Sequence, residues 1–117
     1  MATIKSFSDL QQSKKLAEFL PLESADMRIG NYVGESGKVD GTNVHYYPKG
    51  ESFGAPEIIN AWSLASLLGV LPNENMLVKT TDGEYYCLAK DVMTKHYDNP
   101  VDACVTMIEE LYDLNLL

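Results

Sequence analysis

The hydrophobic positions of the chain follow a helical spacing in three segments. In the first, residues 8–20, leucine and alanine recur every three to four positions, and Ser8 with Gln11 has the spacing of a capping box. Pro21 cannot continue a helix, so we expect the segment to end before it. The pattern therefore predicts an amphipathic N-terminal helix.

The other two helical segments carry clear terminal signals. In the short central segment, Ser63 is a suitable N-cap and Gly69 can take the left-handed conformation behind the last turn. In the C-terminal segment, Asn99 is a suitable N-cap, Pro100 fits the first helical position, and Asp102 lies where the helix dipole favours an anion. We expect a short central helix and a long C-terminal one.

Alternating and β-rich segments fill the intervals between these helices. Asp82-Gly83 separates two of them and is the sequence signal of a tight hairpin. A two-residue closure there places Val78 opposite Cys87 and Thr80 opposite Tyr85. The predicted strands are residues 27–33, 43–47, 57–61, 76–81 and 84–90.

This order of elements predicts an α+β fold. Short connections favour antiparallel pairing, and the two longer helices must bury their apolar stripes. We expect one antiparallel sheet of four or five strands, with the N- and C-terminal helices on one face and the short helix at an edge. A chain of 117 residues predicts a single domain, residues 1–117.

The charge of the chain narrows the class of partner. With 17 acidic and 9 basic side chains the net charge is −8, and Lys14-Lys15 is the only adjacent basic pair. Nucleic acids and anionic membranes are bound by clustered cations, so neither is an expected partner. No signal peptide precedes the first helix, and the longest nearly apolar run, residues 62–71, is too short to span a membrane. We expect a cytoplasmic protein.

The C-terminal helix is the most informative segment. At 100° per residue, its apolar arc covers about 200°, which is wider than one-sided packing on a sheet needs. Either another part of the chain covers the extra flank, which we favour, or the flank is an interface, for instance of a homodimer. Beside it lies an acidic sector, and no Lys or Arg follows Lys95. The candidate interaction surface comprises Asp102, Ala103, Met107, Glu109, Glu110, Asp113 and Leu114.

One catalytic motif occurs in the glycine-rich segment 30–56. Residues 50–54 fit the pattern G-x-S-x-G with Ser52 as nucleophile, and Asp91 and His96 follow in the order of a hydrolase acid and base. The motif needs a strand before it and a helix after it, whereas prolines lie on both sides. We therefore assign no catalytic residue and do not expect an enzyme.

The sequence indicates no metal or cofactor site. His45, Cys87, His96 and Cys104 lack the paired spacing that lets two ligands share one turn. Both cysteines lie in apolar contexts and are interpreted as small buried hydrophobic residues. The tyrosine doublets 46–47 and 85–86 should direct one ring to each face of a strand.

Three segments resemble a known group of proteins. They are Phe7–Ala17, Ala61–Pro72 and Asp98–Val105, and they coincide with the three predicted helices. They are similar to segments of small proteins from gut bacteria and their phages and mobile elements, a family with no assigned activity. The resemblance implies an accessory protein and transfers no functional residue.

These observations together favour a non-catalytic protein-interaction or accessory module. A small serine hydrolase that uses Ser52 and His96 is one alternative. The other is an acidic inhibitor of a nucleic-acid-binding protein, since the acidic helix sector could imitate the charge of DNA.

Overall fold

The structure is a computed structural model that describes residues 5–51 and 54–117. Its contacts group these residues into two units, residues 9–63 and residues 5–8 with 64–117. The fold class is α+β, as the sequence predicts. The single sheet of four or five strands is wrong, because the described strands form two separate three-stranded antiparallel sheets. We describe the two units separately, and the single domain stays a prediction.

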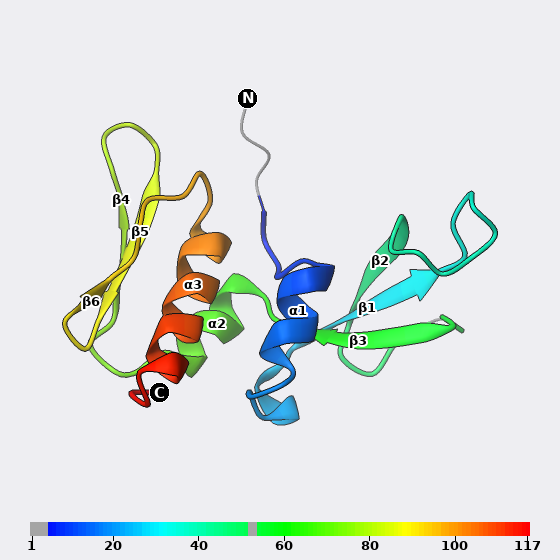
Figure 1. The fold of residues 1–117 in the computed structure, drawn as a ribbon, viewed down its shortest axis with the longest axis horizontal. Coiled ribbons are helices and arrows are strands. Elements are labelled where there is room, and N and C mark those ends of the chain that lie inside the picture. Colours follow the sequence, from blue (N-terminus) through cyan, green and yellow to red (C-terminus); the bar gives the residue numbers. More distant parts are fainter. Residues whose placement is uncertain (1–4, 52–53) are drawn as a thin grey trace. The chain divides into compact units, whose positions relative to one another are not determined.

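The unit of residues 9–63 has β1 in the middle of its sheet, in the order β2-β1-β3 (Figure 1). Ile29 of β1 lies opposite Tyr46 on one side and Ile59 on the other. Ile29 is fully buried, and α1 packs against β3. The elements of this unit are α1 (Leu10–Leu16), a 3₁₀ turn (Leu22–Ser24), β1 (Met27–Tyr32), β2 (Asn43–Pro48) and β3 (Glu57–Ala61).

The first helix begins one residue later than we predicted. Asp9, not Ser8, is the N-cap: its carboxylate accepts a hydrogen bond from the Gln12 backbone N–H at 2.8 Å. The Gln12 side chain in turn accepts from the Asp9 backbone N–H at 3.0 Å, which completes a capping box. Both Ser8-Gln11 and Asp9-Gln12 have the required spacing, and a carboxylate is the stronger acceptor.

A buried tryptophan anchors the end of this unit. The indole N–H of Trp62 donates to Ser24 Oγ at 2.9 Å, and the Ser24 hydroxyl donates to the Pro21 carbonyl at 2.6 Å. Trp62 is fully buried, so this chain of hydrogen bonds satisfies its polar nitrogen.

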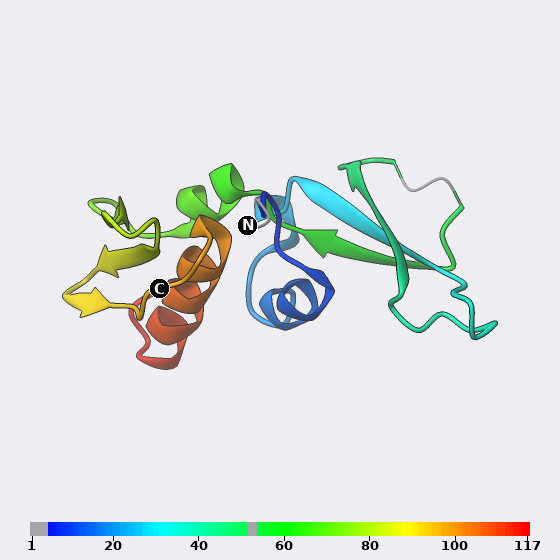
Figure 2. The same ribbon diagram turned by 90° about the horizontal axis from the view of Figure 1, so that it is seen from above.

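The other unit consists of a second sheet and two helices. The strands lie in the order β4-β5-β6, and α3 packs against all three while α2 packs against α3 (Figure 2). Seven residues of α3 are buried, and they include residues from both the main apolar stripe and its extra flank. The elements are α2 (Leu64–Val70), β4 (Met76–Lys79), β5 (Tyr85–Ala89), β6 (Val92–Met93) and α3 (Pro100–Asp113).

The hairpin register differs from the prediction by one residue. Thr80 N–H donates to the Glu84 carbonyl at 2.8 Å, so the loop has three residues instead of two. Only Gly83 takes a positive φ, 83°, whereas a two-residue turn would also force Asp82 into that region. In consequence Val78 lies opposite Tyr86 and not Cys87. This one-residue difference in register places each β4 side chain, relative to its β5 partners, on the face opposite to the predicted one.

Two further features of this unit differ from the prediction. Gly69 does not end the central helix in a left-handed conformation, because the helix continues through it to Val70. The strand β6 is an addition to the predicted set. It follows a two-residue turn in which Lys90 and Asp91 both have positive φ, 51° and 63°. Such a turn usually contains Asn or Gly, so no sequence signal indicates this one.

Candidate interaction surface on the C-terminal helix

The start of α3 is held by the cap that the sequence predicts. Asn99 Oδ1 accepts from the Asp102 backbone N–H at 2.8 Å, and Pro100 occupies the first turn. The Asp102 carboxylate is itself engaged, because Lys5 Nζ lies 2.8 Å from Oδ1 and Asn99 Nδ2 donates to Oδ2 at 2.8 Å. Asp102 therefore belongs to the helix cap and offers a partner little free charge.

The middle of the predicted surface is inside the protein. Ala103 and Met107 are both fully buried in the folded chain. Of the two alternatives for the extra apolar flank, burial within the chain is the one observed at these residues. Neither side chain is on an exposed surface.

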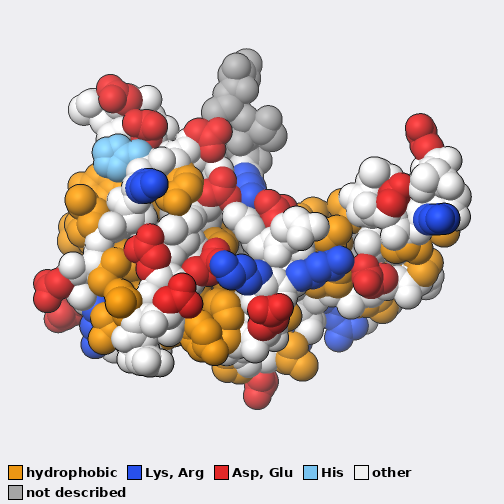
Figure 3. Space-filling model, viewed as in Figure 1, with side chains coloured by type: hydrophobic (Ala, Val, Ile, Leu, Met, Phe, Trp, Pro, Cys, Tyr) orange, Lys and Arg blue, Asp and Glu red, His pale blue; other side chains and the backbone are white. Residues whose placement is uncertain are grey.

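The remaining predicted residues lie at the end of the helix. Glu109 and Glu110 are half-buried, whereas Asp113 and Leu114 are exposed. The last turn contains no basic residue. Acidic and hydrophobic side chains lie beside one another over α3 (Figure 3). The exposed part of the predicted surface is thus reduced to the C-terminal turn.

Three exposed apolar residues that the predicted surface did not include lie in or directly after this C-terminal turn. Tyr112 is 49% exposed although its helical position placed it in the buried stripe, and Leu116 and Leu117 are 42% and 45% exposed. Leu114 itself is 56% exposed. The run of leucines after the last acid is the signal that could have indicated them. We call Glu110, Tyr112, Asp113, Leu114, Leu116 and Leu117 the α3 end.

The α3 end has a defined backbone. Asn115 takes a left-handed φ of 58°, and the Leu116 N–H donates to the Leu111 carbonyl at 2.8 Å. The Asn115 N–H donates to the Tyr112 carbonyl at 3.0 Å, which completes a Schellman motif. The helix terminus therefore fixes the backbone at Leu114 and Leu116.

The residues of the hydrolase hypothesis are not assembled in the described part of the chain. Ser52 lies outside the described residues, so its role stays a prediction. Asp91 lies in the turn beyond Ala89, whereas His96 precedes Tyr97, which pairs with Tyr85 at the other end of β5. Four strand residues separate these ends by roughly 13 Å. His96 instead stacks on Tyr86, with ring centroids 4.9 Å apart.

The structure places the histidines and cysteines on separate segments of the chain. Among the described residues there is no group of three or more His, Cys, Asp or Glu side chains that could hold an ion. Cys87 and Cys104 are free, fully buried thiols on β5 and α3. A thiol–thiol hydrogen bond, followed by burial, raises the pKa of Cys104, and the same bond lowers the pKa of Cys87.

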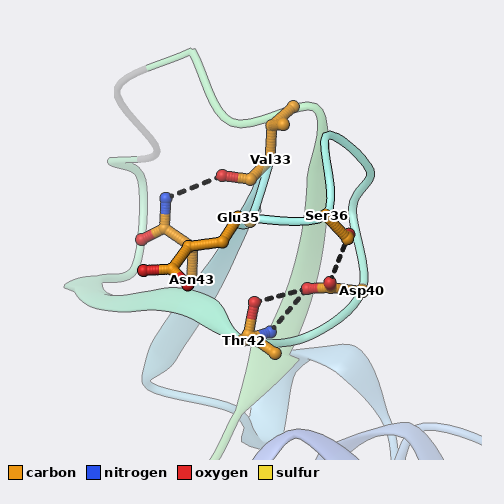
Figure 4. A pocket seen from close by; sticks show the side chains of 7 residues that line it. Val33, Glu35, Ser36, Asp40, Thr42 and Asn43 are labelled. Carbon is orange, nitrogen blue, oxygen red and sulfur yellow. Dashed lines mark hydrogen bonds between the residues drawn. The ribbon is translucent and has the colours of Figure 1, made fainter.

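The glycine-rich loop between β1 and β2 surrounds a hollow of about 710 Å³ (Figure 4). Asp40 organises the loop: it accepts from Ser36 Oγ at 2.6 Å and from both the hydroxyl and the backbone N–H of Thr42. These hydrogen bonds, that from Ser36 first, lower the pKa of Asp40 to about 2. The Asp40 carboxylate accepts hydrogen bonds from its own loop, so Asp40 offers no free charge to a ligand in the hollow.

Comparisons with protein-family models, with curated proteins and with solved structures find no match. Within the described ranges, no helix is long and apolar enough to cross a membrane. The chain's own geometry therefore has to indicate its function.

Proposed function

We propose that the protein is a non-catalytic interaction module that binds another protein through the α3 end. The observation that carries the proposal is the exposure of Tyr112 and Leu114 beside Asp113 in a turn without a basic residue. Exposed large apolar side chains gathered in one place mark contact surfaces more often than isolated ones do.

Electrostatics indicate the kind of partner. The C-terminal end of a helix carries a partial negative charge, which cations stabilise and carboxylates do not. Glu110 and Asp113 therefore lie where their charge is unfavourable for the isolated helix. A basic partner surface would relieve this repulsion, and its apolar centre would cover the leucines. The proposed partner is a protein with a basic rim around an apolar patch.

Site-specific photo-crosslinking in the host cell tests the proposal. A photoreactive phenylalanine analogue at position 114 should give a discrete protein adduct, and the same analogue at the exposed position 35 should not. The variant Glu110→Lys/Asp113→Lys should abolish the adduct. The charge-matched control Glu35→Lys/Glu51→Lys alters exposed acids elsewhere and should retain it. Loss of the adduct in both double variants would show a general charge effect and contradict the assignment.

The identity of the adduct separates the remaining hypotheses. If DNA displaces the partner from the α3 end, the acidic-inhibitor alternative is supported. DNA and the α3 end would then compete for the same cationic side chains of the partner. An adduct of twice the mass of the chain would support the homodimer. Light scattering of the purified wild-type protein and of Leu114→Glu would then show a dimer and a monomer respectively.

A further inference from the structure

The other unit contains an arginine with an unusual environment. Arg28 is the only arginine of the chain and lies on the central strand β1, opposite Tyr47 of β2 and Asn60 of β3. Its Nε is buried and lacks a hydrogen-bond partner in the described structure. Among the described residues no carboxylate forms an ion pair with it, although the chain has 17 acids. A desolvated nitrogen without an acceptor needs an explanation.

On the face of the sheet that carries Arg28, the described strand residues include no acid. Residues directly opposite in an antiparallel sheet share a face, so the register defines its members. Glu57 is on the other face, where its carboxylate accepts from Asn31, and the carboxylate of Asp26 accepts from Ser63. We call this surface the arginine face; its strand side chains are Arg28, Tyr32, Asn43, His45, Tyr47, Ile58 and Asn60.

The composition of the arginine face is that of a protein-binding hot spot. Arginine and tyrosine are among the residues most enriched at positions that dominate binding energy at interfaces. Tyr32 and Tyr47 are half-buried, and Ile58 is 46% exposed. His45 meets the edge of the Tyr32 ring, with centroids 5.4 Å apart. Rings, one guanidinium and one exposed aliphatic side chain therefore share one surface.

We propose that the arginine face binds a peptide segment of a partner protein that carries one carboxylate next to an apolar side chain. Arg28 binds the carboxylate, and the tyrosine rings with Ile58 cover the apolar side chain. The guanidinium has already lost water at Nε, which lowers the cost of replacing its remaining hydration by a carboxylate. A nucleic acid is not the ligand, because it needs several cations and this face has one arginine. The proposal is independent of the α3 end.

Nuclear magnetic resonance of the unaltered protein tests this directly. A chain with one arginine gives one arginine Nε–H signal, so Arg28 reports on its own binding. The probes are N-acetyl-aspartyl-leucine amide and its neutral counterpart N-acetyl-asparaginyl-leucine amide. We expect the aspartyl probe to shift the Arg28 Nε–H and Gly30 N–H signals saturably. Its affinity should exceed that of the asparaginyl probe by about tenfold or more, as one charge-assisted hydrogen bond provides.

A matched pair of variants localises the effect. Arg28→Met keeps the aliphatic stem and should abolish the shift at Gly30, whereas Lys38→Met removes an exposed cation of the same unit and should retain it. Equal affinity for both probes, an unmoved Arg28 signal, or a Gly30 shift that survives Arg28→Met would overturn the proposal. Inorganic phosphate or a short oligonucleotide that binds more tightly than the aspartyl probe would also overturn it. Because the first measurement uses the wild-type protein, it does not depend on the folding of a variant.

Discussion

The hydroxyl oxygens of Tyr32 and Tyr47 lie 2.8 Å apart, although the two residues are not register partners. Tyr32 is opposite Asn43, and Tyr47 is opposite Arg28 four positions along β1. Their side chains lean towards each other over Gly30, which is midway between them. A Cβ at Gly30 would lie 2.9 Å from one ring and 3.0 Å from the other. The glycine therefore provides the space in which the two rings meet.

Replacing this glycine should destabilise its unit. We expect Gly30→Ala to lower the free energy of unfolding by about 1–3 kcal/mol, because the methyl group would displace both rings and also meet Ala55 at 3.0 Å. Gly69→Ala is the matched control: nothing lies within 4 Å of its Cβ, and alanine favours the helix by about 0.5–1 kcal/mol. Denaturant unfolding of both variants gives the comparison. A Gly30→Ala protein as stable as wild type would contradict the observed ring positions.

The tyrosine pair should also affect stability at high pH. The hydrogen bond between Tyr32 and Tyr47, followed by burial, raises the pKa of Tyr32 from 10.0 to about 12. The protonated form is thus favoured in the folded state, so its contribution is complete below pH 10 and is lost as the pH rises through about 12. Absorbance titration of tyrosinate should show one tyrosine that ionises late. In Tyr47→Phe that late step should move towards pH 10, whereas Tyr86→Phe should leave it unchanged.

The stability of the protein should also depend on the N-cap of α3. Asn99→Ala removes the acceptor for the Asp102 N–H, and we expect a loss of about 1 kcal/mol in the free energy of unfolding. Asn99→Ser preserves a capping oxygen and should retain most of that stability. Asn73→Ala, at an exposed asparagine, serves as the control in thermal unfolding. Equal stability of all three variants would show that the cap contributes nothing.

The two thiols should react only when the protein unfolds. Cys87 and Cys104 are fully buried, so a thiol reagent at neutral pH should modify them at the rate of unfolding. Because their mutual hydrogen bond lowers the pKa of Cys87, Cys104→Ala should raise the pKa of Cys87. Mass spectrometry of alkylated protein across a pH series measures both effects. Rapid modification of the native protein would contradict the burial of the thiols.

Local signals account for the parts of the fold that the sequence predicts correctly. The Asn99 cap and Pro100 define the start of α3 by interactions within one turn of helix. The strand predicted at residues 57–61 has the observed bounds. In contrast, the hairpin register depends on the cost of placing Asp82 at a positive φ, which a two-residue turn would require. The Asp-Gly pair by itself does not show that this cost decides the register. The two-residue turn at Lys90 and Asp91 has no sequence signal at all.

The sequence predicts the candidate site only in part, because burial depends on neighbouring elements as well as on local signals. Helical periodicity predicts that Glu110 and Asp113 share one acidic sector, but it cannot distinguish the buried Met107 from the exposed Leu114. Both lie on the same helical flank, and only the position of neighbouring elements decides which one is covered. The sequence predicts Asp102 as a surface acid, whereas its partner Lys5 is 97 residues away in the chain.

The sequence by itself determined the α+β class, the positions of the helices and the concentration of acid near the end of the chain, because propensity, capping and charge are local properties. Only the tertiary structure decided that the described strands divide between two sheets and that Tyr32 meets Tyr47. It also decided that Arg28 lies on a sheet face whose described strand residues include no acid. These relationships depend on strand register and on contacts between residues far apart in the chain. A register shift of one residue would move every side chain to the other face, and periodicity alone does not specify which register packs best.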